Sequence, residues 1–259
     1  MEVLTLVEDV SKQKNKVFEK QPGIKLVNPC TVGNGIVSFS PFLQDELMKK
    51  YDNKNVSTCF FIPASGSGSR MFQFLYEFLE NPNGQSSGDV ERFFNHIKDF
   101  AFYRKIPNSI KDLSLFENTN LDKFIRFLLD EEGLGLAHVP KGLIPFHKNG
   151  PFILNAFQEQ VLQASRIKSK DLHIHFTIND KYEKQIKHSL KSIENLTGNE
   201  FDISFSIQDP KTNAIAFGED QNPIEIGDSE TLTRPAGHGA LLQNLNNISA
   251  DVIFMKNID

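Results

Sequence analysis

The sequence predicts an α/β fold built around a largely parallel β-sheet. The continuous apolar run Cys59–Ile62 is typical of a strand buried on both faces, and a turn of small residues and a helical pattern follow it. Two further strands with alternating apolar and polar residues are expected at Leu172–Ile178 and Phe201–Ile207, with helical segments before and between them. Strands and helices that alternate in this way imply crossover connections, which join parallel strands.

The composition narrows the classes of function. A chain of 259 residues can form one large α/β domain or two small ones, and its 39% hydrophobic and 24% charged residues are typical of a globular protein. The net charge of −5 argues against a general binder of nucleic acid or anionic membranes, and the two cysteines are too few for a disulfide framework. Because neither a membrane span nor a secretory signal is evident, we expect a cytoplasmic protein.

The first 55 residues are expected to precede the sheet domain. Apolar residues at helical spacing predict a helix over residues 1–20, and Gln21-Pro22-Gly23 would end it. Residues 24–42 are rich in turn signals, and residues 43–51 have the pattern of a short helix. We therefore expect a helical, turn-rich extension at 1–55 and an α/β domain at 56–259.

The stretch 57–71 combines the first buried strand with a glycine-rich turn and the start of a helix over 72–80. In α/β proteins this order presents backbone N–H groups and a positive helix end to phosphate. The glycine-rich turn lacks the lysine of a Walker loop and the third glycine of the dinucleotide fingerprint, since its sequence is Gly66-Ser67-Gly68-Ser69-Arg70-Met71. An ordinary turn without a ligand is the alternative interpretation.

Residues 84–135 are predicted to form a helical insertion. Asp89 can cap a helix whose apolar stripe runs to Phe100, and Leu121–Leu129 is a further amphipathic helix. After the insertion we expect a helix from Phe152 to about Ile167 and another over Lys181–Leu196, which alternate with the strands described above.

The second strand carries His173 and His175, two residues apart and therefore on one face. A His-x-His pair on a strand can bind a metal ion, but no carboxylate or third histidine accompanies it in the nearby sequence. We favour a paired polar face over a metal site.

Two further segments toward the C-terminus have features of ligand sites. The first has glycines before a helix, and the second has a carboxylate at the end of a strand. Residues 231–241 contain Pro235-Ala236-Gly237-His238-Gly239 just before an expected helix at 240–245. The final segment, 250–259, has the pattern of a buried strand with Asp259 at its carboxyl end, the edge at which parallel sheets bind ligands. A turn histidine without chemistry is the alternative for His238.

These segments resemble motifs of the nucleoside-diphosphate-sugar pyrophosphorylases, a family of sugar-nucleotidyltransferases. Gly66-Ser67-Gly68-Ser69-Arg70 resembles their G-x-G-x-R signature, and Pro140-Lys141-Gly142-Leu143-Ile144-Pro145 resembles a P-K-x-L-x-P signature that normally follows closely. Here the helical insertion separates the two. The segments at 235–239 and 257–259 resemble the P-x-G-H-G and N-x-D-N motifs of the uridylyltransferases in that family. The whole pattern also looks like an uncharacterised bacterial family known only as a domain of unknown function.

The resemblance implies a Rossmann-like nucleotidyltransferase fold of the GT-A type, a three-layer sandwich with a mainly parallel sheet and a helical insertion. It implies transfer of a nucleotidyl group from a nucleoside triphosphate, with uridine favoured as the base, to a sugar 1-phosphate, with nucleotide-sugar as product. Arg70 and Lys141 would be catalytic, and Asp259 would bind Mg²⁺. The residues implied to bind the nucleotide are Ala64, Ser65, Gly66, Ser67, Gly68, Ser69, Pro235, Gly237, His238 and Gly239.

Two other hypotheses stay open at this stage. The split motif and the position of Asp259 at the last residue favour a non-catalytic module that binds a nucleotide or sugar phosphate. A structural or interaction protein with coincidental loops is the other hypothesis, and it predicts no nucleotide binding. Because the family has a second metal-binding aspartate and a sugar-binding region farther along, we expect the 56–259 domain to be truncated at its C-terminus.

Overall fold

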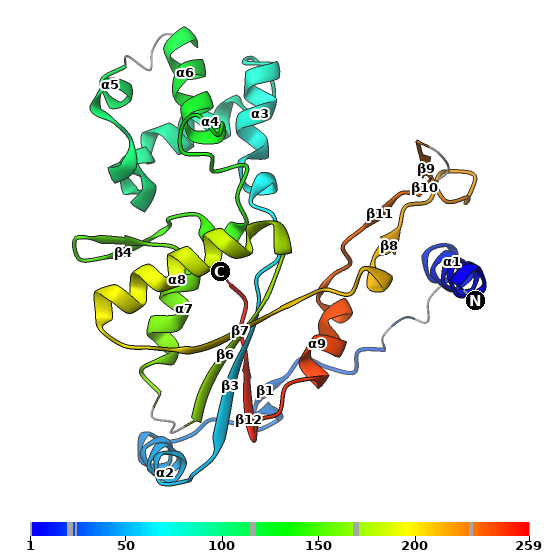
Figure 1. Cartoon of the computed structure of the whole chain (residues 1–259), viewed down its shortest axis with the longest axis vertical. Helices are drawn as coiled ribbons and strands as arrows, with labels where there is room; N and C mark the ends of the chain where they lie inside the picture. Colours follow the sequence, from blue (N-terminus) through cyan, green and yellow to red (C-terminus); the bar gives the residue numbers. More distant parts are fainter. Residues whose placement is uncertain are drawn as a thin grey trace. The chain divides into compact units, whose positions relative to one another are not determined.

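The computed structural model describes residues 2–19, 23, 25–113, 118–167, 171–227 and 230–258 (Figure 1). The chain divides into two compact units. One unit combines Met1–Asn55 with Gln208–Gln243, and the other combines Val56–Ile207 with Asn244–Asp259. The second unit contains the main sheet.

The main sheet has four parallel strands in the order β12-β3-β6-β7. Their bounds are Ser57–Pro63 for β3, Asp171–Ile178 for β6, Asp202–Ile207 for β7 and Val252–Met255 for β12. The register places Cys59 opposite His173 of β6 on one side and Ile253 of β12 on the other. The predicted α/β class with a parallel sheet is therefore confirmed.

Helices α7 and α8 cover one face of this sheet, as Figure 1 shows. α7 (Ala156–Ala164) begins with a capping box formed by Asn155 and Gln158, and α8 (Glu183–Thr197) follows the short turn η5 (Asp180–Tyr182). α8 ends at Gly198, whose φ of 71° is a left-handed conformation that glycine adopts without strain. The core between helices and sheet includes Phe60, Ile62, Phe157, Val161, Ile174, Phe176, Ile186 and Leu190.

A helical body follows β3 and has a core of its own. Its elements are η1 (Ser69–Phe72), α3 (Gln73–Glu80), α4 (Ser87–Asn95), η2 (Ile97–Asp99), η3 (Ala101–Lys105), α5 (Asn108–Lys111) and α6 (Asn118–Leu129), before η4 (Lys141–Leu143). Its core is rich in phenylalanine and leucine, including Phe102, Phe124, Leu128 and Leu129, and also contains Ile144. The predicted helices at 72–80 and 121–129 are therefore present as α3, which begins one residue later than predicted, and α6, which begins three residues earlier.

The predicted helix over 152–167 is partly wrong. Residues Phe152–Leu154 form β5, which pairs with β4 (His147–Asn149) in an antiparallel hairpin. Gly150 takes a φ of 57° in the connecting turn, and the side chain of Asn155 accepts a hydrogen bond from the Gln158 N–H, so the helix begins only at Ala156. The apolar spacing of Phe152 and Ile153 suits both structures, and the cap decides between them.

The first unit consists of the helices α1 and α2 together with short strands and turns. It contains α1 (Glu2–Phe18), β1 (Thr31–Val32), β2 (Gly35–Ile36), α2 (Pro41–Asp52), η6 (Pro210–Thr212), β8 (Ala214–Ile215), β9 (Glu225–Ile226), β10 (Glu230–Thr231), β11 (Thr233–Arg234) and η7 (His238–Leu241). The amide of Gln13 connects α1 to the segment at β8, because its Nε2 donates to the Asn213 carbonyl (3.0 Å) and its Oε1 accepts from the Ile215 N–H (2.8 Å). α9 (Leu242–Asn246) crosses the boundary between the units.

None of the helices in the described ranges combines the length and the apolar character that a membrane crossing requires. A helical layer on the second face of the main sheet, and the nucleotidyltransferase type of the fold, stay predictions.

Candidate functional site

The strand order places a topological switch point between β3 and β12. From β3 the chain proceeds to β6 and β7 on one side, and β12 then pairs with the opposite side of β3. In open parallel sheets the connections after two such strands diverge, which leaves a crevice outside their carboxyl ends where ligands bind. A ligand site at this edge would therefore involve the segments that follow Pro63 and Met255.

The glycine-rich loop after β3 contacts the distant Pro140-Lys141 segment through the backbone. The Lys141 N–H donates to the Gly66 carbonyl (3.0 Å), the Gly68 N–H donates to the Val139 carbonyl (3.4 Å), and Ser67 forms a β-bridge with Pro140. The helical body thus leaves and returns at one point. The glycine-rich loop and the Pro140-Lys141 segment therefore lie side by side.

The two glycines of this loop have different surroundings. A Cβ on Gly68 would lie 2.8 Å from Ile144 Cδ1 and 3.0 Å from the Val139 carbonyl oxygen, so packing within the protein excludes a side chain there. A Cβ on Gly66 would meet no atom within 4 Å. Nothing in the described chain requires glycine at position 66, whereas a ligand that approaches the backbone would.

The loop also offers hydrogen-bond donors. The Ala64 N–H donates to the Thr177 carbonyl (2.8 Å), which fixes the start of the loop against β6. Within the described residues, the N–H groups of Ser65 and Gly66 donate to no backbone or side-chain acceptor. Arg70 is exposed in the turn that follows, and Lys141 is half-buried where its backbone meets Gly66. Backbone donors with nearby cations suit an anionic ligand.

The segment after β12 packs against α7 and against the residue that follows Lys141. The side chain of Gln160 on α7 donates to the carbonyls of Asn257 (3.0 Å) and Ile258 (3.4 Å), and Lys256 Nζ donates to Gln163 Oε1 (2.6 Å). A Cβ on Gly142 would be 2.9 Å from Ile258 Cγ1, so this segment packs directly against the residue after Lys141. Three of the segments singled out from the sequence therefore converge at the switch point.

The predicted metal ligand Asp259 lies outside the described residues. Mg²⁺ usually binds through one or two carboxylates together with substrate phosphate. Among the residues that the structure describes, no group of three or more His, Cys, Asp or Glu side chains could hold a metal ion. The described part of the site therefore does not by itself form a magnesium site.

The Pro235–Gly239 loop belongs to the first unit, where it follows β11 and leads into η7. Added Cβ atoms on Gly237 and Gly239 would meet nothing within 4 Å, and His238 is exposed. The described geometry of the switch point does not include these residues, and their role in nucleotide binding stays a prediction.

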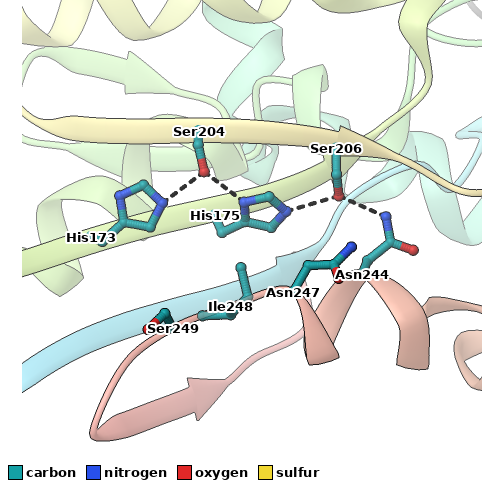
Figure 2. A pocket seen from close by; sticks show the side chains of 8 residues that line it. All are labelled: His173, His175, Ser204, Ser206, Asn244, Asn247, Ile248 and Ser249. Carbon is teal, nitrogen blue, oxygen red and sulfur yellow. Dashed lines mark hydrogen bonds between the residues drawn. The ribbon is translucent and has the colours of Figure 1, made fainter.

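The histidine pair on β6 forms the predicted polar face. Both rings hydrogen-bond to serines of β7: His173 Nε2 and His175 Nδ1 lie 2.7 and 2.6 Å from Ser204 Oγ, and His175 Nε2 lies 2.8 Å from Ser206 Oγ (Figure 2). The sequence carried a signal for this pairing, because His-x-His and Ser-x-Ser recur at the same spacing on two alternating strands that become neighbours.

Comparison with family models matches residues 4–259 to a domain of unknown function, DUF4301. No curated protein and no solved structure matches the chain.

Proposed function

We propose that this chain, which belongs to the DUF4301 family, binds the phosphate groups of a nucleoside triphosphate or nucleotide-sugar outside the carboxyl ends of β3 and β12. One observation carries the proposal. The loop at Ser65–Arg70 and the Pro140-Lys141 segment, which resemble two halves of one nucleotidyltransferase signature, are hydrogen-bonded to each other at the topological switch point of the sheet.

The reaction that we propose is transfer of a nucleotidyl group to a sugar 1-phosphate, with release of pyrophosphate. Both reactants are anions, so the site must neutralise charge and hold the attacking oxygen in line with the bond that breaks. The N–H groups of Ser65 and Gly66 would bind phosphate oxygens. The planar guanidinium of Arg70 suits the departing pyrophosphate, and the ammonium group of Lys141 suits the phosphate that reacts.

The Pro235–Gly239 loop, with His238 as its polar side chain, resembles the base-side motif of uridylyltransferases. Uridine is therefore the base that we propose. Mg²⁺ remains part of the proposal only through Asp259, and we derive no step from it because the described carboxylates do not form a site for it.

A non-catalytic nucleotide-binding module is the second candidate. The helical body with its own core stands between the two halves of the signature, an arrangement that favours a protein that kept the loops for binding. The two candidates differ in one measurement, because only the enzyme releases pyrophosphate from UTP when a hexose 1-phosphate is added.

The test is calorimetric titration of the intact chain with UTP and Mg²⁺, comparing Lys141→Ala with the control Lys123→Ala. Lys123 is an exposed residue of α6, and its loss changes the net charge equally. We expect Lys141→Ala to weaken binding at least tenfold, about 1.4 kcal/mol, and Lys123→Ala to leave it unchanged. Equal affinity in the wild type and Lys141→Ala would remove Lys141 from the site.

A further inference from the structure

A polar cavity lies on the face of the main sheet opposite α7 and α8. It measures about 290 Å³ and is bordered by β6, β7, α9 and the segment that follows α9 (Figure 2). Its lining includes both histidines of β6, Ser204 and Ser206 of β7, and Asn244 and Asn247. The alternation of side chains along the strands separates this cavity from the core between the sheet and helices.

One continuous chain of hydrogen bonds runs along the cavity. Asp202 Oδ2 lies 2.8 Å from His173 Nδ1, and the two rings are linked through the serine hydroxyls described above. At the far end the Asn244 amide donates to Ser206 Oγ (2.8 Å) and to the Ile207 carbonyl (2.9 Å). Every ring nitrogen of the pair therefore has a partner.

The donor and acceptor of each hydrogen bond in this series can be assigned, starting from Asp202. The carboxylate of Asp202 only accepts, so His173 Nδ1 carries the proton and His173 Nε2 accepts from the Ser204 hydroxyl. With its proton committed, Ser204 Oγ accepts from His175 Nδ1, which leaves His175 Nε2 to accept from Ser206. The assignment satisfies every group with both rings neutral.

The two serines differ in the base that each one faces. Ser204 donates to His173, whose other ring nitrogen hydrogen-bonds to the Asp202 carboxylate at 2.8 Å. Ser206 donates to His175, which has a hydroxyl instead of a carboxylate on its other nitrogen. Burial, and next the neighbouring His173, lowers the pKa of His175 to about 4, so this ring is a poor base. Only Ser204 has both the base and the orienting carboxylate of an activated nucleophile.

We propose that Asp202, His173 and Ser204 form a nucleophilic triad that cleaves esters of short, uncharged acyl groups in this cavity. The arrangement meets the geometric requirements of such a site: the nucleophile hydrogen-bonds to the base, and the base hydrogen-bonds to a carboxylate. His175 acts as a positioning residue, because its N–H to Ser204 Oγ directs the serine proton toward His173.

The chemistry balances without a cofactor. Ser204 Oγ bonds to the carbonyl carbon of the ester, and the serine proton passes to His173 Nε2. That proton then protonates the leaving alkoxide as the ester C–O bond breaks. A water molecule, deprotonated by His173, attacks the acyl-serine, and the proton returns to Ser204 as the carboxylic acid leaves.

The cavity indicates the class of substrate. Its volume is at the small end of ligand sites, which favours a small acyl group. Among the described residues that line it, none is a lysine or arginine, so it offers no fixed positive charge to an anionic substrate. The side chains of Asn247 and Ser249 border the cavity and carry hydrogen-bond donors of the kind that stabilise the negative charge of an acyl oxyanion.

A fluorophosphonate probe on the intact, folded protein tests the proposal independently of nucleotide binding. Ser204 Oγ would form a bond to phosphorus, fluoride would leave, and the proton would pass through His173 to solvent. We expect one adduct, assigned to Ser204 by peptide mass mapping, and hydrolysis of 4-nitrophenyl acetate above the buffer rate. Asp202→Asn, a change at an exposed side chain, should slow labelling at least tenfold.

Two variants complete the test. Ser204→Ala should abolish the adduct, whereas Ser206→Ala should keep it on Ser204. Circular dichroism establishes that each variant is folded before labelling. An adduct on Ser206, equal labelling rates in the wild type and Asp202→Asn, or no labelling above that of urea-unfolded protein would each overturn the proposal.

Discussion

Alanine substitutions at the two loop glycines separate ligand binding from packing. In Gly68→Ala the new Cβ would lie 2.8 Å from Ile144 Cδ1, well inside the 3.5–4.0 Å of an ordinary carbon contact. Ile144 is fully buried, and the Val139 carbonyl oxygen at 3.0 Å belongs to the backbone, so neither can move away freely. Overpacking of this kind costs about 1–3 kcal/mol of the free energy of unfolding.

Gly66→Ala should behave in the opposite way. The new Cβ meets no atom within 4 Å, and the residue has no positive φ, so the free energy of unfolding should stay the same or rise by up to about 1 kcal/mol. If phosphate approaches the backbone at this position, the methyl group obstructs it. We expect the dissociation constant for UTP with Mg²⁺ to rise at least tenfold.

Urea unfolding followed by circular dichroism measures the first quantity, and calorimetric titration measures the second. Unchanged UTP affinity in Gly66→Ala would refute the inference that a ligand explains this glycine. Unchanged stability in Gly68→Ala would refute the packing argument, and each result can occur without the other.

Three further predictions concern the second unit. Gly142→Ala places a Cβ 2.6 Å from Phe157 Cε2 and should cost about 1–3 kcal/mol in urea unfolding. The pKa of His175 is 6.5 in the unfolded chain and about 4 in the folded protein, so the unfolded chain binds a proton more readily. The free energy of unfolding is therefore at its full value above pH 6.5 and decreases as the pH falls toward 4. Urea unfolding should therefore show a loss of about 2 kcal/mol between pH 7 and pH 5. Burial raises the pKa of the Cys59 thiol to about 11, so a disulfide reagent at pH 8 should react quickly with the exposed Cys30 alone and with Cys59 only after unfolding.

Each of these has its own control. The control for Gly142→Ala is Gly88→Ala, which adds the same methyl group in open space. Gly150→Ala cannot serve as this control, because the positive φ of Gly150 would strain an alanine. His175→Gln keeps a neutral hydrogen-bonding side chain, so the variant should lose about 2 kcal/mol less unfolding free energy between pH 7 and pH 5 than the wild type does. An equal loss in the variant and the wild type would mean that another group is responsible. Rapid reaction of two thiols in the folded protein would contradict the burial of Cys59.

The parallel sheet could be predicted from the sequence because its pattern is local. The apolar run at Cys59–Ile62 and the alternation in Leu172–Ile178 report burial directly, and both strands are present. The hairpin at His147–Leu154 was missed because the cap at Asn155, rather than apolar spacing, determines where the helix begins. The short strands of 208–243 leave no such pattern, since each has only two residues.

The candidate sites were predictable to different degrees. Pro140 and Lys141 could be associated with the glycine loop only through a family resemblance, because their contact is a backbone pairing between segments separated by the helical body. The link from His173 and His175 to Ser204 depends on strand order and register, which the separate strand patterns do not specify. Whether the Pro235–Gly239 loop and Asp259 join the switch point stays a prediction.

A thermal-shift titration of the intact chain tests the central claim, that the switch point binds nucleotide phosphates, most directly. The four nucleoside triphosphates and UDP-sugars would be compared with and without Mg²⁺. A ligand at 100 times its dissociation constant adds about 2.7 kcal/mol to the stability of the folded state. We expect such a shift with UTP, and its loss in Gly66→Ala. Absence of a shift with every one of these ligands would contradict it.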